Sequence, residues 1–459
     1  MSADWPSMKI SNVAYYRNNK RVPLKSLDRA KRQGIYPYYG ASGVVDHIDD
    51  YVFNGTFLLI SEDGENLRSR KTPVAFKAQG KFWVNNHAHI LEEKEEGILD
   101  YLEYYFSQLD LTPYITGAVQ PKLNKANLDT IEIPIPPLED RRAINGTLNS
   151  LTDKIQLNHQ INQTLEQMAQ AIFKSWFVDF EPVKAKIAAL EAGGNEDDAL
   201  LAAMQAISGK APEDLTRLQA EQPEQYAELR ATAELFPSAM QDSEQGEIPE
   251  GWSVSQIGYE VTVVGGGTPS TKNPTFWEDG QISWTSPKDL SNLPDKILVE
   301  TERKITEAGL SKISSGLLPV NTVLMSSRAP VGYLALAKIP IAVNQGYIAM
   351  KCEKVLSPEF VIQWCVAHMD EIKSRASGTT FAEISKKNFK IIPLAMPPKP
   401  LISIYSRQTS SLYEAIENNV RESDTLETIR DSLLPKLLSG ELSLPSIQEQ
   451  PELQVVASV

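Results

Sequence analysis

Residues 116–142 read TGAVQPKLNKANLDTIEIPIPPLEDRR, and residues 377–398 read SGTTFAEISKKNFKIIPLAMPP. Each stretch holds a glycine, a polar segment with an asparagine, and an extended apolar run that ends in two prolines. Gly117 lies 261 positions before Gly378, and Pro137 lies 261 positions before Pro398. Because the two intervals are equal, the stretches indicate two copies of one pattern, and internal duplication is the first feature to test in a long chain.

The match continues beyond these stretches at the same offset. The identical pairs include Lys125/Lys386, Asn127/Asn388, Ile131/Ile392, Leu151/Leu412, Ile155/Ile416, Asn158/Asn419, Leu165/Leu426 and Glu166/Glu427. No gap is needed over about fifty residues, and the offset is too long for a solenoid repeat. The chain is therefore expected to contain two copies of a module in which a domain is followed by a helix.

Each double proline is followed by a long helical pattern. Apolar residues recur at helical spacing over residues 138–176 and 401–437, which predicts one apolar stripe on each helix. A helix of nearly forty residues would be about 60 Å long at 1.5 Å per residue. Proline is tolerated at a helix start, and Pro435 and Gly440 are expected to mark the end of the second helix. Two equal stripes favour a paired coiled coil; the alternative is that each helix packs on its own domain.

Two blocks, residues 1–134 (the first block) and 249–396 (the second block), are rich in short β-branched or aromatic runs broken by Gly, Asn and Ser. This pattern predicts a mixed α+β domain in each block. Their sequences correspond to one another. FLLISEDG (57–64) matches VLMSSRAP (323–330), and NNHAHIL (85–91) matches NQGYIAM (344–350).

The rest of the chain falls into four segments. Residues 135–181 and 397–440 hold the long helices, residues 182–248 form an acidic connector of short helices, and residues 441–459 form a flexible tail. The length of 459 residues fits two to four domains. Residues 181–250 carry 15 acidic and 5 basic residues, which is most of the net charge of −14. The remainder can still present a basic face, so DNA is not excluded as a partner.

Location can also be predicted. MSADWPSMKI at the N-terminus lacks the apolar region of a signal peptide, and no apolar run approaches 18 residues. Two cysteines, Cys352 and Cys365, are too few for a disulfide framework or a zinc site. We expect buried thiols in a reducing cytoplasm and no contact with a membrane.

Catalytic motifs are missing from the sequence. There is no P-loop pattern, and GGGTPS (265–270) lacks the strand, tight turn and helix of a dinucleotide site. The double prolines follow Ile135 and Met396, whose side chains cannot accept a hydrogen bond from an adenine amine, so no amino-methyltransferase motif is present. We therefore expect no catalytic residue, no bound cofactor and no metal site in this chain.

Two chemical alternatives stay open. Asp295, Glu302 and Lys304 loosely match a nuclease site in which carboxylates hold a divalent ion, although KITEAGL (304–310) is typical of a helical surface. His87 and His89 alternate on an expected strand; they could bind a metal or be satisfied by hydrogen bonds.

Polar residues gather on glycine-marked turns between the expected strands of both blocks. Arg can bind guanine, and Asn or Gln adenine, through paired hydrogen bonds, while Lys and Ser hold phosphates. For each residue the alternative is an ordinary solvated loop or, for the tyrosines, a core position. The candidate DNA-binding residues are Tyr38, Tyr39, Ser42, Glu62, Glu65, Asn66, Arg68, Arg70, Lys71, Asn86, Gln120 and Lys122 in the first block, and Thr268, Ser270, Thr271, Lys272, Ser286, Lys288, Ser327, Arg328, Asn344, Gln345 and Thr380 in the second.

The chain resembles the DNA specificity subunit of type I restriction–modification systems. The order of block, long helix, connector, block and long helix is that of the family. Similar stretches spread over about residues 30–440 include IYPYYGASG, LLISEDG, LEQMAQAIFKSWFVDFEPV, GGTPSTKN, SSRAPVG and LETIRDSLLPKLLSGEL. One stretch departs from the family: LEDRRAI follows the first double proline, but KPLISIY follows the second and lacks the usual glutamine–arginine pair.

The resemblance implies an α+β chain with two similar target recognition domains of mixed α/β structure. Two long helices forming an antiparallel coiled coil would separate them in a pseudo-twofold internal repeat. Each domain would read one half of a bipartite, asymmetric site in double-stranded DNA, and the helices would set the spacing. Two methyltransferase subunits carrying S-adenosylmethionine would methylate adenine N6, and restriction subunits using ATP and magnesium would join through them. The chain itself would be a non-catalytic recognition subunit.

Two other classes of function compete with this one. An autonomous nuclease would depend on Asp295 and Glu302. A scaffold that does not bind DNA would show no sequence-dependent affinity and no salt dependence.

Overall fold

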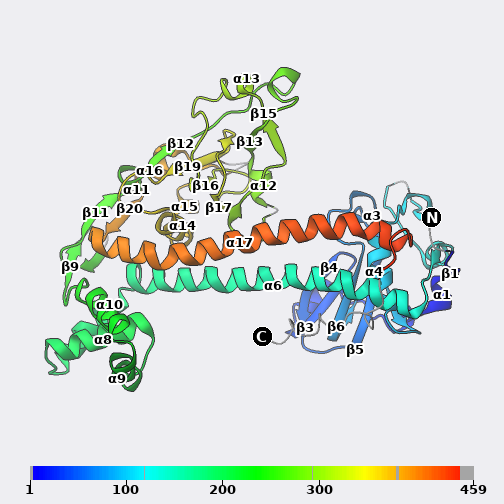
Figure 1. Cartoon of the computed structure of the whole chain (residues 1–459), viewed down its shortest axis with the longest axis horizontal. Coiled ribbons are helices and arrows are strands. Elements are labelled where there is room, and N and C mark those ends of the chain that lie inside the picture. The colour runs from blue at the N-terminus through cyan, green and yellow to red at the C-terminus, as the bar shows by residue number, and fades with distance from the viewer. Residues whose placement is uncertain (1–3, 118, 245, 292, 379–381, 445–459) are drawn as a thin grey trace. The chain divides into compact units, whose positions relative to one another are not determined.

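A computed structural model describes residues 4–117, 119–244, 246–291, 293–378 and 382–444 of the chain (Figure 1). The chain divides into two compact units. Unit 1 comprises Met1–Ile155 and Thr425–Val459, and unit 2 comprises Gln156–Asp424. Each unit therefore contains one block and a part of both long helices.

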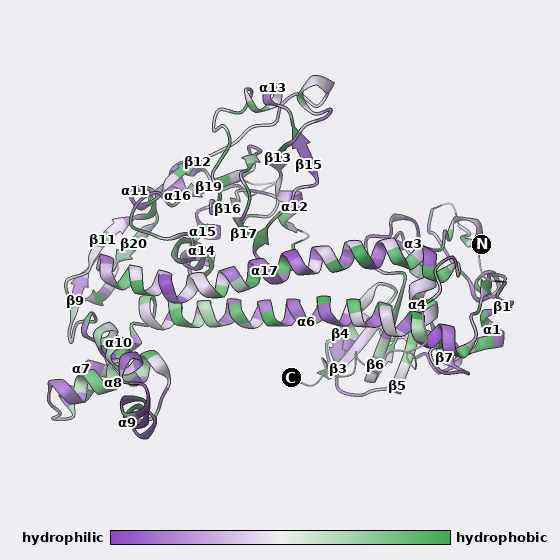
Figure 2. Ribbon diagram, in the orientation of Figure 1, coloured by the Kyte–Doolittle hydropathy of each residue, from purple (hydrophilic) through white to green (hydrophobic). Residues whose placement is uncertain are grey.

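The long helices are α6 (Leu138–Phe177) and α17 (Lys399–Leu438), of 40 residues each. Their bounds are offset by the same 261 positions as the sequence repeat, so the expected equal length and phase are confirmed. Both follow a double proline, whose missing N–H would be unpaired at a helix start in any case. Figure 2 shows hydrophobic and hydrophilic residues alternating along both helices, as an amphipathic stripe requires.

The end of α17 differs in part from expectation. Pro435 lies inside the helix and does not end it. A proline removes one N–H···O bond, but the carbonyl of Pro435 still accepts from the N–H of Ser439 (3.0 Å), so the last turn continues to Leu438. Gly440 follows the helix as expected, with a φ of 67° that glycine adopts without strain.

In unit 2 the two helices run antiparallel and are joined by polar side chains, as well as by the packing of Phe173 on Tyr405. Asn158 of α6 donates to the hydroxyl of Ser423 (3.3 Å), and Asn419 of α17 donates to the side-chain oxygen of Asn162 (2.9 Å). The residue numbers fall along one helix as they rise along the other, so the helices are antiparallel. The 261-residue offset converts each of these two contacts into the other, which is a local pseudo-twofold relation.

In unit 1 the same two helices meet through apolar side chains. Ile144 and Leu148 of α6 and Leu434 and Leu437 of α17 belong to one buried cluster, which also includes the core of the first block. The burial of apolar side chains is the main source of stability in such a contact.

The first block is built on a six-stranded sheet with the strand order β2-β7-β5-β6-β3-β4. Leu58 and Ile60 of β5 pack on the side of α4, and Leu59 packs in the cluster of Phe53 and Phe82, as the two-residue period of a strand requires. The elements are β1 (Ser7–Lys9), α1 (Ile10–Val13), β2 (Ala14–Tyr16), η1 (Asn18–Lys20), α2 (Ser26–Arg29), β3 (Gln33–Gly40), β4 (Gly43–Ile48), β5 (Phe53–Ser61), α3 (Asn66–Ser69), β6 (Ala75–Val84), β7 (Ala88–Glu93), α4 (Ile98–Gln108), η2 (Thr112–Tyr114), α5 (Lys125–Leu128) and β8 (Glu132–Pro134).

The second block has a five-stranded sheet, β12-β19-β16-β17-β14, and a three-stranded sheet, β15-β13-β18. Val323 and Met325 of β16 pack with Phe360 and Trp364 of α14, whereas Leu324 belongs to the cluster on the other face. The elements are β11 (Ser253–Gln256), α11 (Ile257–Glu260), β12 (Thr262–Val264), η3 (Pro274–Phe276), β13 (Ile282–Thr285), α12 (Pro287–Ser291), β14 (Ile297–Leu298), β15 (Arg303–Ile305), α13 (Glu307–Leu310), β16 (Val323–Ser326), β17 (Leu334–Ala337), β18 (Ala342–Val343), β19 (Tyr347–Lys351), α14 (Pro358–Ala367), α15 (Met369–Ser374), α16 (Lys386–Lys390) and β20 (Pro393–Met396).

A two-stranded antiparallel ribbon closes each block. In the first block β1 pairs with β8, with Met8 opposite Ile133. In the second block β11 pairs with β20, with Ser255 opposite Leu394. The first and last strands of each block are therefore neighbours, and a long helix follows each ribbon after a few residues.

The structure corrects the expected correspondence of the blocks by one residue. Aligned by their letters, Ser61 would match Ser327. The ladders instead pair Ser61 with Ala88 and Ser326 with Tyr347. Thus Ser61 matches Ser326, because strand pairing, and not letter similarity, sets the register.

The connector is helical, as expected, and three of its four helices, α8 to α10, share a small apolar core. The four helices are α7 (Glu181–Glu191), α8 (Glu196–Ser208), α9 (Pro212–Glu221) and α10 (Pro223–Glu234), and the β9–β10 hairpin (Met240–Ser243 and Gly246–Pro249) follows them. The stretch 304–310 is only partly helical, because Lys304 and Ile305 belong to β15 and the short helix begins after the N-cap Thr306. Residues 445–459 of the expected tail lie outside the described part of the chain. Among the described residues, no helix is both long and apolar enough to span a membrane.

Candidate nucleic-acid interface

Three segments meet at one end of the sheet in the first block, and we call this place the first edge. It consists of Glu62 and Asp63 after β5, the turn 85–87 between β6 and β7, and the described part of the segment 116–124. The N–H of Glu62 donates to the carbonyl of His87 (2.8 Å), and the N–H of Leu123 donates to the carbonyl of Glu62 (2.8 Å). A backbone ladder thus fixes the three segments relative to one another.

The second block repeats this arrangement at the second edge, formed by Ser327 and Arg328, the turn 344–346 and the described part of 377–385. The N–H of Ser327 donates to the carbonyl of Gly346 (2.8 Å), and the N–H of Ile384 donates to the carbonyl of Ser327 (3.0 Å). Ile384 lies 261 positions after Leu123, so the same bonds recur in the second copy. The two edges share one backbone frame.

An asparagine shapes the turn in both edges. The side-chain oxygen of Asn85 accepts from the N–H of His87 (2.8 Å), and that of Asn344 accepts from the N–H of Gly346 (2.8 Å). Such local bonds are a frequent use of asparagine in turns. The next residues, Asn86 and Gln345, are exposed at the tips of the turns.

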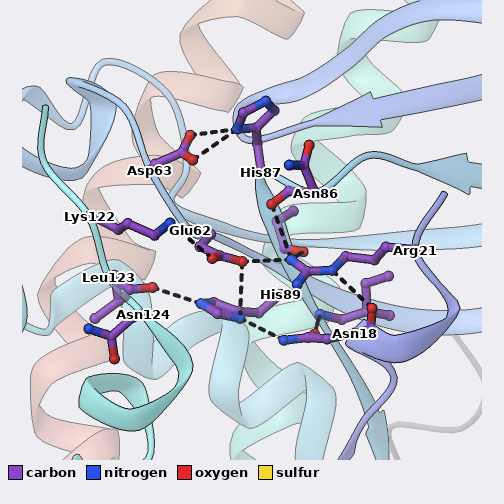
Figure 3. Close-up of polar contacts among 12 residues, drawn as sticks. Asn18, Arg21, Glu62, Asp63, Asn86, His87, His89, Lys122, Leu123 and Asn124 are labelled. Carbon is purple, nitrogen blue, oxygen red and sulfur yellow. Dashed lines mark hydrogen bonds and ion pairs between the residues drawn. The ribbon is translucent and has the colours of Figure 1, made fainter. Parts of the chain in front are cut away.

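Beneath the first edge lies a polar network that the sequence did not reveal (Figure 3). Arg21 donates to the carboxylate of Glu62 (2.6 Å) and to the carbonyl of Ala88 (2.9 Å). His89, which is 1% exposed, contacts the carbonyl of Leu123 through Nε2 (2.7 Å) and the amide nitrogen of Asn18 through Nδ1 (2.9 Å). These contacts hold the edge segments from below.

The protonation of this network follows from its surroundings. Burial lowers the pKa of His89, which favours the neutral ring. A carbonyl can only accept, so Nε2–H donates to Leu123 and Nδ1 accepts from Asn18. Burial alone would raise the pKa of Glu62, but the hydrogen bond from Arg21 and nearby cations hold it below its usual value, so Glu62 is ionised at neutral pH.

The side chains beneath each edge form what we call its floor. The floor of the second edge is mostly apolar. Ser327 stands where the first edge has Glu62; it is 3% exposed, and its hydroxyl has no hydrogen-bond partner among the described residues. By the pairing of β16 with β19, Ile348 stands where the first edge has His89, and it is fully buried. The same frame therefore rests on an ionic floor in one block and a largely apolar floor in the other.

Several of the expected DNA-binding residues are exposed on or near the edges. Lys122 and Asn86 belong to the first edge, and Arg328 and Gln345 to the second. Thr268 joins the second edge by donating to the side-chain oxygen of Gln345 (2.7 Å). The other exposed candidates are Ser42, Glu65, Arg68, Lys71, Gln120, Ser270, Thr271, Lys272 and Lys288; of these, Arg68 donates to the carbonyl of Gly117 and Lys288 pairs with Glu302.

Other candidates have structural roles that the sequence concealed. Tyr38 is 1% exposed and its hydroxyl accepts from the N–H of Leu24 (2.9 Å), so it is a core residue and not a DNA contact. Arg70 donates to the carbonyls of Phe106 (2.9 Å) and Leu109, which secures the end of α4. Ser327 is also buried, so its side chain is not accessible to DNA.

The remaining candidates are constrained in part. Tyr39 is half-buried between Phe76 and Phe82, and burial raises the pKa of its hydroxyl. Asn66 bonds the backbone of Thr72, Ser286 bonds Asp289, Glu62 belongs to the ionic floor, and Asn344 shapes its own turn. Thr380 lies outside the described residues.

Sequence reasoning missed Arg21, Asp63 and Glu383. Arg21 reaches Glu62 only through the fold, and Asp63 and Glu383 are acidic and so do not suit a phosphate contact. The matching positions of the repeat provided a signal, because Lys122 and Glu383 lie 261 positions apart.

The residues of the two chemical alternatives are engaged in hydrogen bonds and ion pairs. Asp295 is 6% exposed at its side chain and accepts from His159 (2.9 Å) and Asn162 (3.0 Å) of α6, whereas Glu302 pairs with Lys288. His87 lies in the turn rather than on a strand, and it binds the carboxylate of Asp63 (2.9 Å). Over the described ranges, no group of three His, Cys, Asp or Glu side chains is arranged to hold a metal.

Comparison with known proteins agrees with this duplicated architecture. Residues 2–167 and 249–421 match the family described as the type I restriction modification DNA specificity domain. The HindI specificity subunit, a type I restriction enzyme component of Haemophilus influenzae, is 36% identical over 330 residues, which are 70% of this chain and 71% of that protein. The MjaIX specificity subunit of Methanocaldococcus jannaschii is 34% identical over 197 residues, 42% of this chain and 45% of that protein.

A solved structure shows the same fold. It is the S subunit of a type I restriction–modification system from M. genitalium, with a TM-score of 0.54 at 13% identity, covering 95% of this chain and 96% of that one. The chain belongs to the type I restriction–modification DNA specificity family. It is a DNA-recognition subunit and not the catalytic component of such a system.

Proposed function

We propose that this chain reads a bipartite, asymmetric DNA site, with each block reading one half. In this proposal residues 1–134 and 249–396 are the two target recognition domains, 135–181 and 397–440 are the helical segments, 182–248 is the connector and 441–459 is the tail. One observation carries the proposal: the two edges share a backbone frame but present unlike side chains. A repeated frame with different donors and acceptors is suited to reading two different base sequences.

The proposed contacts follow from exposure and charge. In this proposal Lys122 and Asn86 contact the first half-site, and Arg328 and Gln345 contact the second. Lys71 and Lys272 are exposed lysines that suit phosphate contacts, which position a protein on DNA without reading sequence. The net charge of −14 does not oppose this, because nine acidic residues lie in the connector helices α8 to α10 alone.

The proposed partners are two methyltransferase subunits, which would carry S-adenosylmethionine and methylate adenine N6 in each half-site. Restriction subunits with ATP and magnesium would join through them, in the cytoplasm where the DNA is. An exposed apolar row on α6 supports docking: Leu157, Ile161 and Met168 are 49%, 38% and 48% exposed at helical spacing. The chain needs no cofactor of its own in this scheme.

The central test is a map of methylated adenines in cells that express the complete system with and without this chain. We expect methylation at one bipartite sequence that disappears when the chain is removed. Methyl transfer by the isolated chain would contradict the proposed division of labour. An alanine pair at Asp295 and Glu302 that abolishes restriction while leaving DNA binding intact would favour the nuclease alternative instead.

The helices are proposed to set the number of base pairs between the half-sites. Four residues inserted between 151 and 152 of α6 and between 429 and 430 of α17 add about 6 Å to both helices at 1.5 Å per residue. Since a base step is about 3.4 Å, the preferred spacer should grow by about one or two base pairs, with both half-sites unchanged. An active variant that keeps the original spacer would show that other elements hold the readers apart.

A further inference from the structure

The two edges carry opposite charges at equivalent bridged positions. In the first edge position 63 bridges position 122, and in the second edge position 328 bridges position 383. The residues are Asp63 and Lys122 in one copy and Arg328 and Glu383 in the other. Acid and base have therefore exchanged sides across the same backbone bridge.

In the first edge the acidic side chain of Asp63 is mostly buried, whereas the side chains of Lys122 and His87 are exposed. Asp63 is 17% exposed at its side chain and is bound to His87 (2.9 Å), which is 46% exposed. Lys122 is 52% exposed and lies 3.6 Å from the carboxylate of Glu62, which is 14% exposed at its side chain. The exposed cationic donor thus lies on the segment 119–124, and the exposed His87 on the turn offers an acceptor nitrogen.

In the second edge the exposed donor lies on the other side of the bridge. Arg328 follows β16 and is 41% exposed, and its guanidinium lies 3.7 Å from the carboxylate of Glu383, which is 48% exposed. A carboxylate beside a guanidinium limits the rotation of the arginine fork and leaves its other N–H groups for a ligand. Both groups remain accessible from the edge.

We propose that these bridged pairs are specificity-determining positions of the two half-sites. Arg328, oriented by Glu383, hydrogen-bonds the O6 and N7 atoms of a guanine in the half-site of the second block. Lys122 supplies the donor in the half-site of the first block, and Asp63 orients His87 by accepting from its Nδ1–H, which leaves Nε2 of the neutral ring as an acceptor. The inference rests on the proposed function and adds Asp63, His87 and Glu383 to the residues that decide sequence.

Because the basic residue lies on opposite sides of the bridge in the two edges, its proposed contact with DNA also shifts in position. Residues across an antiparallel bridge are about 4.5–5.5 Å apart at Cα, compared with about 3.4 Å per base step. Donors on opposite sides of one frame therefore reach bases about one step apart. Two copies of one frame can in this way read half-sites that differ in register as well as in composition.

The test is a charge exchange in the full chain, assembled with its methyltransferase subunits and assayed on DNA randomised over both half-sites. The variant Arg328→Asp/Glu383→Lys keeps the net charge and reverses the pair. We expect a loss of about 5- to 150-fold in preference at one or two adjacent bases of the second half-site, with the first half-site read as before. Arg328→Lys keeps the charge but not the fork, and it should lose the guanine preference by a similar factor.

The matched control is Asp214→Arg/Arg217→Asp, which reverses an exposed ion pair of the connector helix α9 (2.7 Å). It should change neither half-site. The first half-site reports correct assembly in every variant. Unchanged base preference in Arg328→Lys, or an equal loss at both half-sites, would overturn the inference, whereas a wild-type chain without any sequence preference would overturn the proposed function itself.

Discussion

The two long helices meet through an apolar layer in unit 1 and through a polar layer in unit 2, where Phe173 and Trp176 of α6 also pack on Tyr405 of α17. The apolar layer comprises Ile144, Leu148, Leu434 and Leu437, and the polar layer comprises Asn158, Asn162, Asn419 and Ser423. Apolar contacts stabilise in proportion to area but tolerate sliding, whereas buried hydrogen bonds stabilise little and permit one register. The difference indicates that the apolar layer of the helix pair mainly supplies stability, whereas its polar layer mainly sets the register.

The largest effect is expected in the apolar layer. Leu437→Ala removes a fully buried side chain and should lower the stability of unit 1 by about 2–5 kcal/mol. Hydrogen exchange of the α4 and β5 amides would measure it. Ile429→Ala is the matched control, because Ile429 is 41% exposed on the unit 1 part of α17 and its truncation should cost far less. Equal protection losses in both variants would contradict the assignment of stability to this layer.

A smaller effect is expected where the polar layer meets the second block. Asp295→Ala removes the acceptor of both His159 and Asn162, and a loss of about 1–3 kcal/mol in unit 2 is expected because a buried amide loses its partner. Asp295→Asn keeps an acceptor and should recover part of this stability. Thermal unfolding monitored in unit 2 would compare the two variants. If Asp295→Ala is as stable as the wild-type chain, the polar layer draws no stability from this carboxylate.

The smallest effect on stability, but the most informative for register, is expected inside the polar layer. Asn158→Leu/Ser423→Ala removes both side chains of one bond, and the carboxylate of the exposed Glu422, which also accepts from Asn158 (2.8 Å), returns to water, so stability should change by less than about 1 kcal/mol. The helices should then adopt more than one register, and methylation should spread to sites with altered spacers. Asn158→Gln/Ser423→Thr is the control that keeps polar partners. If methylation stays at one spacer in the Leu/Ala variant, the polar layer does not set the register.

The sequence predicted features that depend on local chemistry. The repeat, the 40-residue helices and their starts at double prolines follow from spacing and from the geometry of proline. The prediction that Pro435 ends the second helix was wrong, because a proline near a helix end removes only one backbone hydrogen bond.

The candidate site was less predictable, because its residues are distant in sequence. Arg21, Glu62, His89 and Leu123 meet only through strand pairing, and no local pattern shows that pairing. The one-residue error between the blocks has the same origin. The sequence also did not show which side chains are exposed. Tyr38 and Lys122 both follow turn signals, yet Tyr38 lies in the core and Lys122 lies on the surface.

The closing ribbons of the two blocks have a consequence for evolution. Because β1 pairs with β8 and β11 pairs with β20, the chain enters and leaves each block at adjacent points. A block can therefore be exchanged between related genes as one cassette while the helix that follows it stays the same. If each block reads one half-site as proposed, new pairs of half-sites can then arise by recombination in single steps, without a change in the apolar and polar layers of the helix pair.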